Sequence, residues 1–187
     1  MHSRNSDRRV HRTRLELLAA FRELVFERDY DKIRVTDISD RADVGRSTFY
    51  EHFESKDDIL EHSLTTLLKV LADAIGAADV SQRFRGVIEH FWENRSGARS
   101  MLSGTTRQVV TRLLSGLIKE RLGLLSGNLS DSRPLIPLDY IASHLAETQL
   151  ALFGAWLLGN AWCSPAALAQ ALHVSTNASA SALLNKA

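Results

Sequence analysis

The 187-residue sequence contains a single cysteine, Cys163, and only three prolines. One cysteine cannot form an intramolecular disulfide, which excludes a disulfide-stabilised secreted domain and fits a reducing cytoplasm. The longest apolar run, residues 150–158, is far shorter than the roughly 20 residues of a membrane-spanning helix. The polar segment that follows Met1 does not have the composition of a signal peptide. These absences predict a cytoplasmic protein without a membrane partner.

Sequence motifs of the common enzyme classes are missing as well. There is no glycine-rich phosphate loop, no H-E-x-x-H and no cluster of zinc ligands. Cys163 and several histidines could in principle supply a nucleophile and a base, but none stands in a recognised catalytic spacing: His62, His90, His144 and His173. We therefore expect a protein that is not an enzyme, with no catalytic residue, metal or cofactor. A small helical enzyme using Cys163 is kept as an unlikely alternative.

The sequence also lacks an excess of either charge. Its 23 Lys and Arg residues nearly balance 22 Asp and Glu residues, so the net charge is only +1. Binding to DNA would then depend on where individual charges lie rather than on a basic surface overall. The one local imbalance is in residues 1–14, where Asp7 is opposed by five arginines: Arg4, Arg8, Arg9, Arg12 and Arg14. We expect residues 1–9 to form a basic flexible arm, either a frayed end or a segment that follows DNA.

The most informative stretch is residues 35–56, V-T-D-I-S-D-R-A-D-V-G-R-S-T-F-Y-E-H-F-E-S-K. It predicts two short helices joined by a turn at residues 43–45. Thr36 can cap the first helix, which should end near Ala42. Gly45 can adopt a backbone conformation that is closed to most residues, as a tight turn between two helices requires.

The second helix of this pair should begin at about Arg46 and bury Phe49 and Phe53, which lie four residues apart on one face. A helix-turn-helix reader of DNA needs this layout, because its second helix must pack on one side and present polar groups on the other. Arg46 is the first candidate for reading a guanine, with a phosphate contact as the alternative. The full set of predicted DNA-binding residues is Thr36, Arg46, Ser47, Thr48, Tyr50, His52 and Lys56.

This stretch resembles the helix-turn-helix signature of the TetR family of transcriptional regulators (TetR/AcrR-type). The resemblance covers roughly residues 10–62, and its most diagnostic part is S-T-F-Y-x-H-F-x-S-K. The family usually has glycine before the aromatic residue that follows the first helix, whereas this chain has Asp29 before Tyr30. The resemblance implies a repressor that binds a near-palindromic DNA operator as a homodimer and is released by a small-molecule inducer. Control by a protein partner is the alternative.

Apolar residues recur at helical spacing through the rest of the chain, and little of it resembles a strand. We therefore predict an all-α protein, with a three-helix DNA-binding domain over residues 10–55 and a helical regulatory and dimerisation domain over residues 56–187. Helices are expected at residues 10–28 and 56–75, the second capped by Ser55 and Asp58. Further helices should begin after Ser81, after a break near residues 96–97, at Thr105, at Pro137 and at Ser164-Pro165. A loop is expected over residues 123–137.

Two sets of residues in the second domain are candidates for function. The resemblance implies an inducer pocket among the middle helices, for which the lining candidates are Phe84, Ile88, Phe91, Trp92, Met101, Leu114 and Leu117. The two last helices are so apolar that a second copy of the chain is expected to cover them in a four-helix bundle. The interface candidates are Ile141, Leu145, Leu152, Leu168 and Leu172. The pocket candidates could instead be ordinary core.

Overall fold

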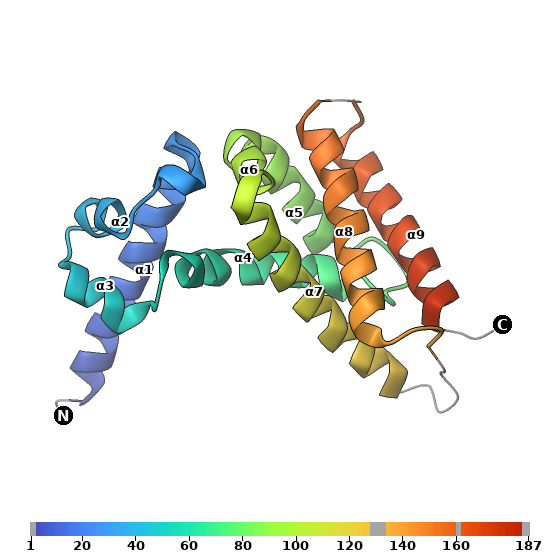
Figure 1. The fold of residues 1–187 in the computed structure, drawn as a ribbon, viewed down its shortest axis with the longest axis horizontal. Helices are drawn as coiled ribbons and strands as arrows, with labels where there is room; N and C mark the ends of the chain where they lie inside the picture. Colours follow the sequence, from blue (N-terminus) through green and yellow to red (C-terminus); the bar gives the residue numbers. More distant parts are fainter. Residues whose placement is uncertain (1–2, 128–133, 160–161, 185–187) are drawn as a thin grey trace. The chain divides into compact units, whose positions relative to one another are not determined.

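The computed structural model describes residues 3–127, 134–159 and 162–184 (Figure 1). All regular structure in these three segments is helical, which confirms the predicted all-α fold. The chain divides into two compact units, Met1–Ser63 and Leu64–Ala187. The division falls inside helix α4 (Lys56–Asp73), later than the boundary at residue 55 that the sequence suggested.

The first unit contains α1 (Ser3–Glu27), the 3-10 turn η1 (Tyr30–Lys32), α2 (Val35–Arg41), α3 (Arg46–His52) and the start of α4. Both α2 and α3 follow the predicted bounds of the helix pair closely. Side chains from α1 to α4 bury one another almost completely in a small core: Leu17, Phe21, Ile38, Phe49, Phe53 and Ile59. The predicted inward packing of Phe49 and Phe53 is confirmed, and it holds α3 against the other helices.

The first helix begins earlier than predicted. It starts at Ser3 rather than near Val10, so residues 3–9 are helical where the sequence suggested a flexible arm. The apolar spacing that revealed this helix marks only its buried part. No glycine or proline interrupts the polar turns before it, so nothing ends the helix there.

The turn between α2 and α3 is built differently from the prediction. Gly45 has an ordinary φ of −68°, whereas Asp43 has the left-handed φ of 53°. Asp43 directly follows the last turn of α2, a position where helices commonly end in the left-handed conformation. A Cβ atom on Gly45 would meet Ser47 Oγ at 3.6 Å, which is ordinary contact. The fold therefore requires the special backbone conformation of Asp43 and not that of Gly45.

Of the two predicted helix caps, the one at α2 is wrong and the one at α4 is confirmed. Thr36 lies within the first turn of α2 and is not its cap, because Arg34 is the extended residue before the helix. The Asp37 carboxylate accepts a hydrogen bond of 2.8 Å from the Arg34 backbone N–H. At α4 the predicted cap is confirmed, since Ser55 Oγ accepts from the Asp58 backbone N–H at 3.1 Å.

The second unit contains the rest of α4, α5 (Gln82–Glu93), α6 (Arg95–Met101), α7 (Gly104–Gly127), α8 (Leu138–Leu157) and α9 (Pro165–Leu184). Helix α8 packs on α7 and on α9, and α9 also packs on α5 (Figure 1). The predicted break at residues 96–97 is wrong: α5 ends at Glu93, Asn94 follows, and Gly97 is buried inside α6. The centre of the predicted loop, residues 128–133, lies outside the described residues.

The longest apolar run of the sequence, residues 150–158, falls largely within α8. Among the helices of the described residues, none combines the length and the apolar character needed to cross a bilayer.

Candidate nucleic-acid interface

Helix α3 has one buried and one exposed side. Phe49 and Phe53 lie beneath it, with ring centroids 5.7 Å apart. On the opposite side Arg46 and Ser47 are exposed, as is Tyr50, whose side chain is 51% accessible. The helix therefore displays a cation and two hydroxyl groups from a surface that the aromatic core holds in place. This is the arrangement that contacts to base edges and phosphates require.

The Tyr50 ring lies edge-on to the Phe49 ring, with centroids 5.4 Å apart. Its hydroxyl has no hydrogen-bond partner among the described residues, so the ring is supported while the hydroxyl stays available. Thr48 and His52 are half-buried at the sides of α3. Thr36 is half-buried too, in the first turn of α2.

A contact from α1 secures the end of α3, and the sequence did not reveal it. Arg14 Nη1 donates a hydrogen bond of 3.3 Å to the His52 carbonyl oxygen. The Arg14 guanidinium carbon also lies 4.8 Å from the centroid of the Phe53 ring. Arg14 was noted in the sequence only as part of a basic segment. Its structural role depends on a partner far away in the chain, for which no local pattern exists.

Lys56 was predicted to contact phosphate and has a second role in the fold. Its Nζ donates a hydrogen bond of 2.9 Å to the Tyr30 carbonyl oxygen and lies 4.0 Å from the centroid of the Tyr30 ring. Burial lowers the pKa of the Lys56 ammonium from its ordinary value. The Tyr30 hydroxyl donates to Asp57, and burial, followed by this bond, raises the Tyr30 pKa. A phosphate contact would have to use the remaining N–H groups of Lys56.

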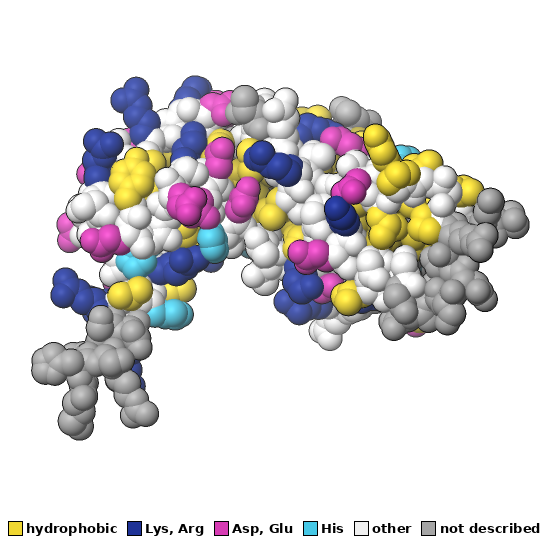
Figure 2. Space-filling model, turned by 60° about the horizontal axis from the view of Figure 1, so that its bottom comes forward, with side chains coloured by type: hydrophobic (Ala, Val, Ile, Leu, Met, Phe, Trp, Pro, Cys, Tyr) yellow, Lys and Arg dark blue, Asp and Glu magenta, His cyan; other side chains and the backbone are white. Residues whose placement is uncertain are grey.

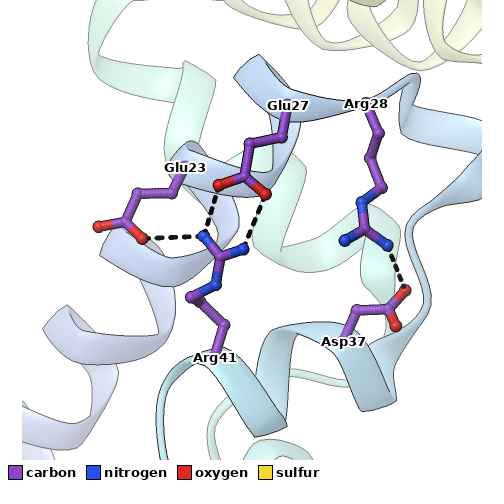
Figure 3. A network of polar contacts seen from close by, with 5 residues as sticks. All are labelled: Glu23, Glu27, Arg28, Asp37 and Arg41. Carbon is purple, nitrogen blue, oxygen red and sulfur yellow. Dashed lines mark hydrogen bonds and ion pairs between the residues drawn. The ribbon is translucent and has the colours of Figure 1, made fainter.

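A cluster of charged side chains joins α2 to the end of α1 (Figure 3). Arg41 donates to both carboxylate oxygens of Glu27, at 2.8 and 2.7 Å, and to Glu23 at 3.1 Å. Beside it an Arg28 nitrogen lies 3.6 Å from an Asp37 carboxylate oxygen. The two-pronged geometry fixes the direction of the guanidinium plane, so the cluster sets the orientation of α2 and, through the turn, of α3.

This cluster gives the first unit a predicted acid sensitivity. Arg41 hydrogen bonds hold the Glu27 pKa below its ordinary value of 4.5. Because the folded state binds this proton less readily than the unfolded chain, the stabilisation is complete above that ordinary value and is lost as the pH falls through the folded-state pKa. We expect the difference in urea midpoint between the parent protein and Arg41→Gln to shrink from neutrality to about pH 3.

Arg22 is the matched control for Arg41, since it is an exposed arginine of α1 without a partner among the described residues. Arg22→Gln is expected to show no pH-dependent difference from the parent protein. If the difference in urea midpoint between the parent protein and Arg41→Gln is the same at neutral pH and at about pH 3, the cluster does not stabilise the fold.

Charges of both signs are mixed on the face drawn in Figure 2. On the face drawn in Figure 2, Lys and Arg side chains alternate with Asp and Glu side chains over both units. No large area of a single charge covers that face, in keeping with the net charge of +1. An interface with DNA then depends on the few side chains that α3 and its neighbours present.

The predicted inducer pocket is only partly assembled. An apolar cavity of about 30 Å³ in the second unit is lined by Phe91, Met101 and Phe153 together with aliphatic side chains of α4, α6, α7 and α8. The other five predicted residues do not line it. Phe84, Ile88 and Leu114 are fully packed in the core, and the Trp92 ring stacks on Trp156 with centroids 4.6 Å apart. Leu117 is half-buried on α7. Helical spacing indicated which side chains are buried, but not which of them border an empty volume.

The predicted dimer residues require a similar correction. Ile141, Leu145, Leu168 and Leu172 are buried within one chain, where α8 packs against α7 and α9. Only Leu152, at 36% accessibility, reaches the surface. Helices α8 and α9 are apolar on more than one side. The side that carries the four buried residues is already covered by neighbouring helices of the same chain. Any interface between copies must use the opposite faces.

The Cys163 side chain is half-buried. The Cys163 carbonyl oxygen accepts a hydrogen bond of 2.9 Å from Trp156 Nε1, in the segment before α9. Among the described residues no group of three or more His, Cys, Asp or Glu side chains is placed to hold a metal ion.

Comparisons with known proteins address the same segment of the chain. Residues 17–62 match the family described as "Bacterial regulatory proteins, tetR family". An uncharacterized HTH-type transcriptional regulator, YxbF of Bacillus subtilis (strain 168), is 33% identical over 79 residues. That match covers 42% of this chain and 21% of YxbF, about a fifth of its length. Both descriptions are of regulators.

Solved structures extend the likeness of the fold to nearly the whole chain. A TetR transcriptional regulator from Streptococcus agalactiae 2603V superposes with a TM-score of 0.62 and 23% identity, covering 94% of this chain and 99% of that one. The dihydroxyacetone kinase operon activator DhaS superposes with a TM-score of 0.56 and 16% identity, covering 92% and 98%. At such identities these structures establish a shared all-helical fold.

Proposed function

We propose that this chain is a member of the tetR family of bacterial regulatory proteins, which its residues 17–62 match, and that it binds DNA sequence-specifically through α3 and regulates transcription in the cytoplasm. The observation that carries the proposal is the two-sided construction of α3. Its aromatic side is buried, and its other side presents Arg46, Ser47 and Tyr50. Thr36, Thr48, His52 and Lys56 lie around this surface as candidates for phosphate contacts.

We further propose that the protein binds a near-palindromic operator as a homodimer. The faces of α8 and α9 that do not pack within the chain carry exposed apolar and small side chains: Leu152, Ala171, Val174 and Ala178. A second copy could cover these faces in a four-helix bundle with two-fold symmetry. Two α3 helices would then enter successive major grooves, with half-site centres about 34–36 Å apart or a multiple of that.

Release from DNA by a small molecule is the finer part of the proposal. The small apolar cavity in the second unit supports it, because a ligand that enlarged this cavity would favour a different arrangement of the helices around it. Repression is the sign that we propose, although the similarly folded DhaS is described as an activator. Control by a protein partner is the second candidate, and a cavity that accepts no small molecule would favour it.

Selection of bound fragments from a random DNA library tests the DNA-binding proposal directly. We expect the purified protein to enrich an inverted repeat, and titration of that site to give two chains per duplex. Binding that depends on salt but shows no sequence preference would contradict the proposal, because contacts to phosphate alone carry no sequence information. Placing the selected site in front of a reporter gene would then determine the sign of regulation.

Arg46→Ala is expected to weaken binding to the selected site by about 1–3 kcal/mol and to relax the preference at one base position. The physical reason is the loss of a two-pronged hydrogen bond to a guanine edge. Affinity should be measured by fluorescence anisotropy for the selected site and for variants at each position. Arg85→Ala is the control, since Arg85 is an exposed arginine of α5 in the second unit. Equal weakening of all sequences would instead assign Arg46 to a phosphate.

A further inference from the structure

A groove with two arginines adjoins the apolar cavity of the second unit. It has a volume of about 290 Å³ and lies between the α6–α7 segment, which contributes Arg99 and Arg107, and one side of α8. Leu102 and Leu157 line both the groove and the apolar cavity, so the two spaces lie on either side of the same pair of side chains. A groove that carries two arginines thus borders an apolar interior across Leu102 and Leu157.

The side of α8 that faces the groove is made of small residues: Ala151, Gly154 and Ala155. A Cβ atom placed on Gly154 would meet no atom within 4 Å, so the space beside it is open. The groove is therefore wide enough for a flat or slender group to lie along α8. Nearly all of this wall is apolar, and the charge is confined to the α6–α7 side.

Arg99 and Arg107 differ in which of their guanidinium nitrogens already have a hydrogen-bond partner. Arg99 Nε donates to the Leu157 carbonyl oxygen in the last turn of α8, which offsets the negative end of that helix. The Arg99 Nη groups have no partner among the described residues. Arg107 Nη2 donates to Glu147 Oε2 at 2.8 Å, and both of these side chains are partly exposed. Glu147 is paired with Arg107 alone and does not line the groove, so the two guanidinium groups that do line it leave room for an anion there.

We infer that this groove binds the carboxylate of a small amphipathic acid, with the apolar chain of the acid directed over Leu102 and Leu157 toward the apolar cavity. The planar guanidinium group of Arg99 can donate two parallel hydrogen bonds to a carboxylate from its free edge. Arg107 supplies a second donor in competition with Glu147. The inference rests on the proposed control by a small molecule and names the chemical class of that molecule.

Isothermal titration calorimetry of the 187-residue chain with octanoate tests the inference. Octanoate is expected to bind, whereas 1-octanol, which lacks the charge, octylamine, which reverses it, and butyrate, which lacks most of the chain, should each bind at least about tenfold more weakly. Binding of 1-octanol as tight as that of octanoate would overturn the inference, as would an absence of octanoate binding. Circular dichroism in the same solutions checks that the protein stays folded.

Two substitutions are expected to change the affinity for octanoate in opposite directions. Arg99→Ala is expected to weaken octanoate binding about tenfold, while Arg85→Ala, on the surface of α5, leaves it unchanged. Because Arg99 also bonds the end of α8, a loss seen with Arg99→Ala alone could reflect a disturbed fold. Glu147→Gln removes the competing carboxylate from Arg107 and is expected to tighten binding several-fold. If Glu147→Gln weakens binding or leaves it unchanged, the inference is overturned.

Calorimetry uses no DNA, so the result does not depend on whether an operator is found. Octanoate that binds as expected but leaves operator affinity unchanged would contradict ligand-controlled release and would leave the carboxylate site standing. Operator binding without octanoate binding would overturn the carboxylate site and would leave the DNA-binding proposal standing.

Discussion

Replacing Phe49 with alanine is expected to destabilise the protein by about 3–5 kcal/mol and to abolish DNA binding with it. The Phe49 side chain is fully buried and contacts the Tyr50 ring on one side and the Phe53 ring on the other. Its removal leaves a cavity beneath α3 that a seven-residue helix cannot close without moving. Since whole domains are stable by only about 5–15 kcal/mol, this one change removes much of what keeps the first unit folded.

The measurement is chemical denaturation followed by circular dichroism, together with anisotropy on the selected DNA. Tyr50→Ala, the adjacent position on the exposed side of α3, separates folding from recognition. It should change stability far less than Phe49→Ala while still weakening DNA binding. A Phe49→Ala protein as stable as the parent would show that the aromatic cluster does not hold α3 in position.

Val174→Arg is expected to convert the proposed homodimer into a monomer and to lower operator affinity by several orders of magnitude. Val174 lies on the outer face of α9 and is 54% accessible in the single chain, so arginine fits there in an isolated protomer. In a four-helix bundle formed by two copies, the same position would bury two like charges near the two-fold axis without partners. A monomer then binds only one half-site and loses the gain from simultaneous contact with both.

Sedimentation velocity gives the oligomeric state for this test, and anisotropy gives the affinity. Val10→Arg is the matched control, because Val10 is exposed to a similar extent, 51%, on α1 in the first unit. The Val10→Arg protein should have the same mass in solution as the parent protein. A Val174→Arg protein that remains dimeric would place the interface on another face.

The helix-turn-helix could be predicted because its signals are local. Phe49 and Phe53 lie one helical turn apart, and Ser55 and Asp58 mark the start of α4 within a few residues. The details of the turn could not be predicted as well. Glycine is the residue that most readily adopts a left-handed backbone, which pointed to Gly45, yet the chain places Asp43 there. Aspartate tolerates that conformation, so composition alone did not distinguish the two positions.

The second unit was predicted less accurately for a different reason. Apolar spacing shows that a side chain such as Leu145 is buried, but buried against the same chain and buried against a second copy give the same pattern. Arg14 and Arg99 have partners at His52 and Leu157, far away in the chain, so no local motif could indicate their roles. A cavity is likewise a property of several helices together.

By itself, the sequence determined the all-helical fold, the position of the helix-turn-helix and the residues offered on α3, because helical periodicity, caps and turns are set by neighbours a few residues apart. Only the tertiary structure decided that α1 begins at Ser3, that α8 and α9 bury Leu145 and Leu172 within one chain, and that Arg99 and Arg107 meet along one groove. These outcomes depend on which helix covers which face, and that choice is made by packing between segments far apart in the chain.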